Sequence, residues 1–426
     1  MATRHLDVRL GAQAEPVGEL IFDEAGSRQT SVFTYHQSWL DHPKRFALSP
    51  GMPLSKAPFH GARNGRFSCL PLPIEDSSPD SWGRKIIERM VSTKYVTDLD
   101  YLIETDDFLR TGALRYFDRA GPKGIALAPP RTEEGQVSVP RLHDLDEIIR
   151  QARAFEEDPA GYAERRANLI GGNLLAEAVG SLGGARPKVN ARSDDGALHI
   201  VKLPKIADDY AMARAEVLAL RLASEVGINA AEATVLNTAQ QFPVAIVKRF
   251  DRVGKGFASR LPFISAQSFL GLTDDGVGNY EGLAMQMRTH CANAAAQIEE
   301  LYRRMIFSIL IRNTDDHLRN HGFLMGARGW LLSPAYDINP EHRPGGRMQT
   351  AISEIHGDVP SVQAAVEASE FFDMKQADAK TLAGDMARHI LARWRPLGAE
   401  LGMNARDFNA ISRSIENDDA RLAARM

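Results

Sequence analysis

The chain has 426 residues, of which 44% are hydrophobic and 25% charged, and its formal net charge is −4. This length predicts two or three folded domains, and the composition excludes a disordered chain. The acidic balance argues against a general affinity for nucleic acid or anionic lipid. Cys69 and Cys291 lie far apart without a CxxC spacing, which favours a reducing cytoplasm over a disulfide framework or structural zinc. No apolar run approaches the roughly 18 residues that span a membrane, so we expect a soluble protein with no membrane partner.

The opening residues predict a small antiparallel sheet. Apolar and polar residues alternate in short runs at 6–10, 17–22 and 31–35, and Gly, Asp and Pro interrupt them. Ser78-Pro79-Asp80 is then typical of a helix start, because apolar residues follow it at helical spacing. These patterns predict an α+β, β-rich N-terminal subdomain over residues 1–120.

The rest of the chain predicts a linker and two further parts. Residues 121–140 are rich in Pro, Gly and charge, which is typical of a linker. Residues 141–255 read as an α/β part, and residues 256–426 as an all-α lobe. The α/β part contains, in order, a Gly-rich loop at 180–184, a β-hairpin formed by 188–192 and 197–203, a helix at 210–226 and a buried strand at 244–250.

A polar segment, Asn313–His321 (NTDDHLRNH), lies between an apolar helix and a short apolar run. Asp315 and Asn320 have the spacing of a kinase catalytic loop, in which the Asp accepts the proton of the substrate hydroxyl and the Asn ligates magnesium. The same residues could instead cap backbone groups in a solvated turn.

A lone carboxylate, Asp337, follows between Pro334 and Pro340. A kinase would place its second magnesium ligand here, because Mg²⁺ prefers carboxylate and amide oxygens. Capping of a turn is again the alternative.

Three features upstream complete a pattern. The glycines of Gly180–Gly184 would let backbone amides approach phosphate oxygens, although a helix C-cap also explains them. Lys202 is a single cation in an apolar strand, and Glu216 on the next helix could pair with it; an edge-strand lysine that reaches solvent is the alternative. The order of these features is that of a bilobal protein kinase, which predicts ATP and Mg²⁺ as cofactors.

Five strings also carry a family resemblance: Ser181–Lys188 (SLGGARPK), Ile200–Pro204 (IVKLP), Lys248–Arg252 (KRFDR), Thr314–His321 (TDDHLRNH) and Tyr336-Asp337. Near the N-terminus, Phe59–Ala62 (FHGA) and Pro79–Arg84 (PDSWGR) lie near the positions of the same family's N-terminal signature. Together these strings resemble the HipA-type serine/threonine kinase toxins of bacterial type II toxin–antitoxin systems. The resemblance covers most of the chain and implies a bilobal protein-kinase-like fold.

The resemblance implies a role for each site residue. Asp315 would be the catalytic base, and Asn320 and Asp337 would be the magnesium ligands. Glu216 would support the lysine of the phosphate site. The residues that would bind ATP are Ser181, Gly183, Gly184, Lys202, Lys248, Arg249, Phe250 and His317. We also expect His317 to support the catalytic loop through hydrogen bonds.

The resemblance further implies regulation and partners. Autophosphorylation of Ser181 would eject the phosphate loop and inactivate the enzyme. A HipB-like helix-turn-helix antitoxin would hold the toxin inactive and provide most of the contact with operator DNA. The substrate would be a translation component such as an aminoacyl-tRNA synthetase. The chain departs from the family pattern at Arg186-Pro187, where Gln-Glu is usual, and at Lys248, where Glu is frequent, so loop and adenine contacts are expected to differ.

Two alternatives come from other classes of protein. His317 and His321 are one helical turn apart and Asp315, Asp316 and His342 are nearby, which would suit a metal-dependent hydrolase, but position 318 is Leu and the Glu of an HExxH motif is missing. A non-catalytic corepressor that binds DNA with its antitoxin is the other alternative, and the intact candidate catalytic positions argue against it.

Overall fold

The computed structural model of the protein describes residues 2–63, 68–90, 96–121, 124–128, 132–133, 136–137, 139–165, 174–178, 180, 186–239, 242–254, 259–273, 277–341 and 345–426. The chain forms two compact units, each made of two separate segments. The first unit combines Met1–Ile206 with Asp251–Ile264, and the second combines Ala207–Phe250 with Ser265–Met426. The four-part division expected from the sequence stays a prediction.

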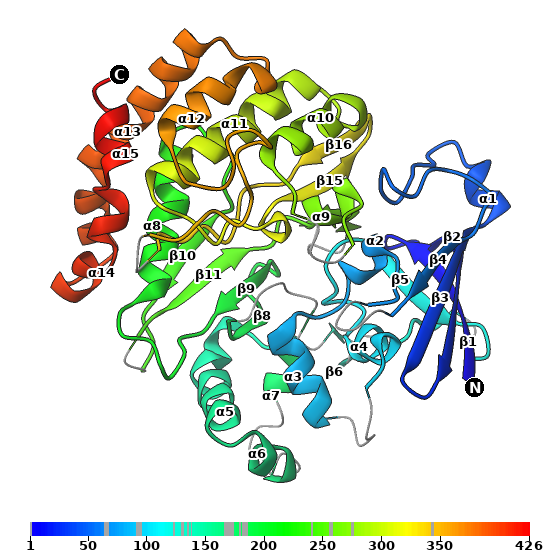
Figure 1. Ribbon diagram of the computed structural model, residues 1–426. Coiled ribbons are helices and arrows are strands. Elements are labelled where there is room, and N and C mark those ends of the chain that lie inside the picture. Colours follow the sequence, from blue (N-terminus) through cyan, green and yellow to red (C-terminus); the bar gives the residue numbers. More distant parts are fainter. Residues whose placement is uncertain are drawn as a thin grey trace. The chain divides into compact units, whose positions relative to one another are not determined.

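A five-stranded antiparallel sheet opens the first unit, in the strand order β4-β3-β2-β1-β5 (Figure 1). Its strands are β1 (Ala2–Leu10), β2 (Glu15–Ala25), β3 (Arg28–Tyr35), β4 (Phe59–Ala62) and β5 (Leu114–Asp118). Because side chains alternate across a strand, Leu6 and Val8 of β1 share one buried face with Leu20 and Phe22 of β2. The sheet predicted from the alternating pattern is confirmed.

Short helices and hairpins follow this sheet in the first unit. They are α1 (Gln37–Leu40), α2 (Leu72–Glu75), α3 (Ser81–Met90), α4 (Asp98–Glu104), β6 (Thr132–Glu133), β7 (Gln136–Val137), η1 (Leu142–Asp144), α5 (Leu145–Glu157), α6 (Pro159–Arg165), α7 (Leu174–Ala178), β12 (Arg252–Val253) and β13 (Ser259–Arg260). Helix α3 begins as its start signal predicts, because Asp80 Oδ1 accepts the backbone N–H of Gly83 at 2.7 Å.

The predicted hairpin is present as β8 (Lys188–Arg192) and β9 (Leu198–Lys202), which pair antiparallel. The turn between the two strands has the residues that the sequence predicts for it. Ser193 accepts a backbone hydrogen bond from Gly196, whose φ of 87° lies in the left-handed region that glycine tolerates best. The register places Lys188 directly opposite Lys202.

The second unit is mainly helical (Figure 1), and its helix α11 (Ala294–Leu310) has ten buried residues. The other elements are α8 (Met212–Glu225), β10 (Ala233–Leu236), β11 (Val244–Lys248), α9 (Ala266–Leu270), α10 (Tyr280–His290), η4 (Leu318–Asn320), β15 (Gly322–Gly326), β16 (Gly329–Leu332), α12 (Val362–Glu367), η5 (Ala368–Phe372), α13 (Gln376–Glu400), α14 (Ala405–Ile415) and α15 (Asp418–Ala423). Along the chain, β14 (Phe263–Ser265) joins the two units.

The C-terminal region is mainly helical, as predicted, but its described residues also include the strands β13, β14, β15 and β16, so the expectation of an all-α lobe over residues 256–426 is wrong there. Strands β15 and β16 pair antiparallel around a turn at Gly326–Gly329. Both strands are too short to show a reliable period. No helix in the ranges described above combines the length and apolarity that crossing a membrane requires.

Candidate active site

The candidate catalytic loop, residues 312–321, connects α11 to β15. It begins at Arg312, whose φ of 54° turns the chain away from the helix axis. The Arg312 guanidinium donates to the Pro360 carbonyl at 3.0 Å and to Asp419 Oδ2 at 2.7 Å. Two segments that are distant in sequence therefore hold the start of the loop.

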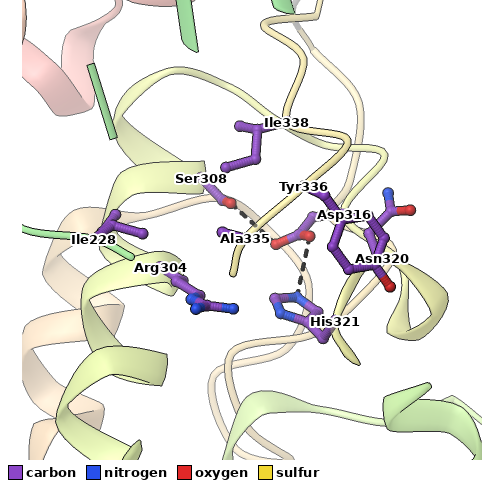
Figure 2. A pocket seen from close by; sticks show the side chains of 9 residues that line it. All are labelled: Ile228, Arg304, Ser308, Asp316, Asn320, His321, Ala335, Tyr336 and Ile338. Carbon is purple, nitrogen blue, oxygen red and sulfur yellow. Dashed lines mark hydrogen bonds and ion pairs between the residues drawn. The ribbon is translucent and has the colours of Figure 1, made fainter. Parts of the chain in front are cut away.

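The buried support of the loop is Asp316. Its carboxylate accepts a hydrogen bond from the Tyr280 hydroxyl. It also accepts one from Ser308 Oγ at 3.0 Å, and its Oδ1 lies 3.1 Å from His321 Nε2 (Figure 2). Burial raises the pKa of Asp316, but His321, Tyr280 and Ser308 outweigh it and hold the pKa below its usual range. The same burial and the charge of Asp316 raise the pKa of Tyr280. Asp316 is thus an ionised anchor inside the second unit.

Asp315, in contrast, is exposed. Partial desolvation raises its pKa, the neighbouring His317 lowers it, and the negative charges of Asp337 and Glu341 raise it again, with a net upward shift. Asp315 and Asp337 are therefore near enough to repel each other. A carboxylate of raised pKa at the surface is suited to accepting a proton, and a cation beside Asp337 would relieve the repulsion.

Asp337 adopts a left-handed backbone conformation with φ of 55°, which non-glycine residues occupy at a cost of about 1–2 kcal/mol. Its Oδ1 accepts from Asn339 Nδ2 at 3.1 Å. The backbone N–H of Asn339 in turn donates to Asn313 Oδ1 at 3.2 Å. The segment that carries Asp337 is therefore bonded directly to the catalytic loop.

Asn320 and His317 lie in the same loop. Asn320 is 8% exposed and its Nδ2 donates to the Asp315 carbonyl at 3.1 Å, which leaves the amide oxygen Oδ1 as the atom that could ligate a metal. His317 accepts the backbone N–H of Asn320 through its carbonyl, whereas its ring Nδ1 is buried without a hydrogen-bond partner in the described part of the chain. The role expected of the His317 ring stays a prediction, and the imidazole that lies against the buried Asp316 carboxylate is that of His321.

The predicted adenine-contacting residues follow β11 in the second unit. Lys248 Nζ pairs with Glu232 Oε2 at 2.9 Å, so its ammonium group is turned to a surface carboxylate. Arg249 is buried, and the Phe250 ring lies 5.6 Å from the Tyr336 ring. The Tyr336 hydroxyl donates to the Arg319 carbonyl at 2.7 Å, which connects this region with the catalytic loop.

The remaining predicted residues lie elsewhere. Lys202 is 8% exposed on β9 of the first unit, and Glu216 is 3% exposed on α8 of the second, so the expected pair stays a prediction. Ser181, Gly183 and Gly184 lie outside the described residues.

The donor set fits Mg²⁺ better than zinc. In the part of the chain that the structure describes, no three His, Cys, Asp or Glu side chains gather as a metal site. Magnesium does not need such a cluster, since it commonly takes one or two protein oxygens and completes its shell with substrate phosphates and water. The Asp337 carboxylate and the Asn320 amide oxygen are hard ligands of this kind. His342, which the zinc alternative named as a nearby residue, lies outside the described residues.

Four residues that contribute to this site were not predicted to do so from the sequence: Asp316, Tyr280, Ser308 and Asn313. Asp316 looked equivalent to Asp315, and nothing near Tyr280 or Ser308 indicated that they bond it. Asn313 is part of the polar segment, and a buried position beside an apolar helix could have singled it out.

A small pocket beneath the loop is lined by Ile228, Arg304, Ser308, Asp316, Asn320, His321, Ala335, Tyr336 and Ile338 (Figure 2).

The chain is similar to several known proteins. The toxin YjjJ of Escherichia coli is 28% identical over 204 residues, or 44% of each chain, and the Sinorhizobium fredii protein named "Putative kinase Y4mE" is 24% identical over 330 residues, covering 72% of this chain and 71% of its own. The HipA of Shewanella oneidensis MR-1, solved with HipB and operator DNA, has the same fold, with a TM-score of 0.68 at 19% identity over 99% of this chain and 96% of its own.

Two family models match the chain. The HipA N-terminal domain matches residues 6–116, and the HipA-like C-terminal domain matches residues 180–394, a segment that contains the candidate catalytic loop and Asp337. The chain therefore belongs to the HipA family.

Proposed function

We propose that the protein is an ATP- and Mg²⁺-dependent serine/threonine protein kinase that acts as the toxin of a toxin–antitoxin pair. The observation that carries this proposal is that Asp315 lies near both Asp337 and Asn320. Asp315 and Asp337 belong to two segments that a hydrogen bond of Asn313 holds together. Capping alone would not require two carboxylates to approach each other, because their repulsion is unfavourable without a cation.

Each residue has a role in this proposal. Asp315 accepts the proton of the attacking hydroxyl, and its raised pKa keeps it in a useful range for that transfer. Asp337 and Asn320 would hold Mg²⁺, which supplies positive charge to the phosphates of ATP. Lys202 would contribute a further cation to those phosphates, and the backbone around Lys248–Phe250 would contact the adenine.

The proposal also includes partners and regulation. A HipB-like antitoxin and operator DNA are supported by the likeness to the Shewanella oneidensis HipA that was solved with both. The relative YjjJ is named a toxin, which supports the proposal that this chain is one. An aminoacyl-tRNA synthetase as substrate and inactivation by phosphorylation of Ser181 rest on the family resemblance of the sequence motifs.

The test is transfer of labelled phosphate from ATP by the full chain, with and without magnesium. We expect transfer that requires Mg²⁺ and is abolished by EDTA, together with growth inhibition on induction without the antitoxin. Mass spectrometry of the same sample then reports whether Ser181 is modified. A wild-type chain that binds no ATP and transfers no phosphate, but still represses its operator with an antitoxin, would replace the kinase with the corepressor.

A further inference from the structure

One side of α11 carries three polar residues on successive turns. Glu300, Arg304 and Ser308 are four positions apart, so their side chains lie on the same side of the helix. Arg304 is 3% exposed and Ser308 5% exposed, and the Arg304 guanidinium pairs with the Glu300 carboxylate at 2.8 Å. A buried ion pair is often no more stabilising than apolar side chains of similar size. This row of polar residues therefore calls for a reason beyond the stability of α11.

The C-terminal end of the row supports the candidate catalytic loop. Ser308 Oγ donates to Asp316 Oδ2 at 3.0 Å. In Figure 2, Arg304 and Ser308 line the pocket beneath the loop from neighbouring turns of α11. Asp316 lines the same pocket from the loop, and Ala335 lines it from the segment that leads to Asp337. The row therefore lies beside both segments that carry the proposed metal ligands.

Arg304 bonds directly to the second of these segments. Its Nη2 donates to the Ser333 carbonyl at 2.8 Å and to the Asn229 carbonyl at 3.4 Å. Glu300 Oε1 accepts from Arg304 Nε at 2.9 Å and from the backbone N–H of Asn229 at 3.0 Å. One ion pair on α11 thus holds two backbone segments that are about a hundred positions apart in the sequence.

The chain between Ser333 and Asp337 has little freedom to move. Ser333 is fully buried, and the ring of Pro334 fixes the backbone angle φ at the next position. The Ala335 N–H donates to the Asn229 carbonyl at 2.7 Å. Asp337 follows only two residues later, so a shift of the Ser333 carbonyl would move the Asp337 carboxylate with it.

We propose that Arg304 is a positioning residue for the metal site. Together with Glu300 it holds the Asp337 segment at a fixed distance from the catalytic loop, which Ser308 holds one turn further along the same helix. This inference rests on the function proposed above, in which Asp337 and Asn320 ligate one Mg²⁺. Mg²⁺ demands near-ideal octahedral geometry, so the spacing of its two protein ligands limits how tightly it binds.

The main test is the dependence of phosphoryl transfer on free Mg²⁺ at a fixed ATP concentration, measured with the full chain. Arg304→Met should raise the half-saturating Mg²⁺ concentration roughly ten-fold, as expected for a residue that orients a metal ligand. The kcat at saturating Mg²⁺ should fall much less, because Asp315 is kept. Arg304→Lys should recover part of the Mg²⁺ affinity, since an ammonium group can still donate to a backbone carbonyl.

The same helix provides a matched control. Arg303 and Glu299 form an ion pair of the same type and spacing at 2.7 Å, but on a more exposed side of α11. Arg303→Met should leave both the Mg²⁺ dependence and kcat unchanged, because a surface pair contributes little and holds neither segment of the site.

Two double variants separate positioning from a general structural effect. Arg304→Met leaves the Glu300 charge without its partner, whereas Glu300→Gln combined with Arg304→Met removes both charges and should show the same Mg²⁺ defect. If Arg304 acts through Asp337, then Asp337→Asn combined with Arg304→Met should bind Mg·ATP no more weakly in calorimetry than Asp337→Asn alone.

The outcomes distinguish this inference from the kinase proposal. A wild-type chain that transfers phosphate with Mg²⁺, and an Arg304→Met variant with the same half-saturating Mg²⁺ concentration, would overturn this inference alone. Additive losses on top of Asp337→Asn would overturn the action of Arg304 through Asp337. A wild-type chain that neither binds Mg·ATP nor transfers phosphate would overturn both. If Arg304→Met and its double variant do not fold, Arg304→Lys decides the matter, because it should fold and still need more Mg²⁺ than wild type.

Discussion

Asn313 Oδ1 accepts the backbone N–H of Asn339 at 3.2 Å, and this bond joins the loop of Asp315 to the segment of Asp337. The Asn313 amide also donates to Ser308 Oγ at 3.3 Å on α11. Asn313 therefore links three segments that must keep a fixed geometry if Asp315 and Asp337 act together.

Asn313→Ala should lower both stability and phosphoryl transfer. Asn313 is 1% exposed, so its removal leaves buried polar partners unsatisfied, at a cost of about 1–3 kcal/mol. Thermal unfolding and steady-state kinetics measure the two effects. Asn409→Ala, at an exposed position of α14, is the control and should change neither. Wild-type kinetics in Asn313→Ala would contradict the linking role.

Asp315→Asn and Asp337→Asn should fail in different ways. Loss of the proton acceptor should reduce kcat about 10²- to 10⁴-fold while Mg·ATP still binds. Loss of the metal ligand should weaken Mg·ATP binding itself. Asn tolerates the left-handed conformation of position 337, so the backbone there should be kept. Calorimetry with Mg·ATP, alongside single-turnover transfer, separates the two; equal ATP affinities in both variants would refute the assignment.

Local patterns predicted the elements that local forces determine. The β8–β9 hairpin was predictable because alternation and a Ser193–Gly196 turn lie within one short stretch. Spacing also singled out Asp315 and Asn320. In contrast, adjacent Asp315 and Asp316 look alike in the sequence, and only the fold makes one exposed and the other buried beside Tyr280.

Contacts between distant segments could not be predicted. Asp80 and Lys188 are 108 positions apart, and each belongs to a local pattern of its own, the start of α3 and the strand β8. No periodic pattern in the sequence indicates that the Asp80 and Lys188 side chains lie close together. The division of the chain into two units, each built from two segments, is hidden for the same reason.

Asp316→Asn should destabilise the second unit and make its stability depend less on pH in acid. Removing one partner from a buried charged cluster costs about 3–5 kcal/mol. Although burial raises the pKa of Asp316, His321, Tyr280 and Ser308 lower it further, so the folded pKa lies below the unfolded one. The stabilisation is therefore present above the ordinary carboxyl pKa of about 4 and is lost as the pH falls through the lowered value.

Thermal unfolding between about pH 3 and pH 7 measures this difference. The gap in Tm between wild type and Asp316→Asn should be widest near neutrality and should narrow in acid. Asp358→Asn, which breaks a surface pair with Arg347, serves as the control and should have a small effect throughout. A gap that stays constant with pH would show that Asp316 contributes through packing and not through its charge.

Asp80→Asn should remove a pH dependence that the Asp80 carboxylate gives to the stability of the protein. Burial raises the pKa of Asp80 from 3.8 to about 6, and the charge of Lys188 and the backbone N–H groups of Gly83 and Trp82 compensate only in part. Because the folded pKa lies above the unfolded one, the ionised carboxylate destabilises the native state above about pH 6, by an amount on the order of 3 kcal/mol, and this penalty disappears as the pH falls toward 4. Asn carries no titrating group, so the Tm of wild type relative to Asp80→Asn should fall as the pH rises from about 4 to about 7. Loss of the carboxylate beside the buried Lys188 ammonium adds a cost of its own to the variant, which shifts the gap in Tm without removing its change with pH. A gap in Tm that stays constant over this range would contradict a raised pKa of Asp80 in the folded protein.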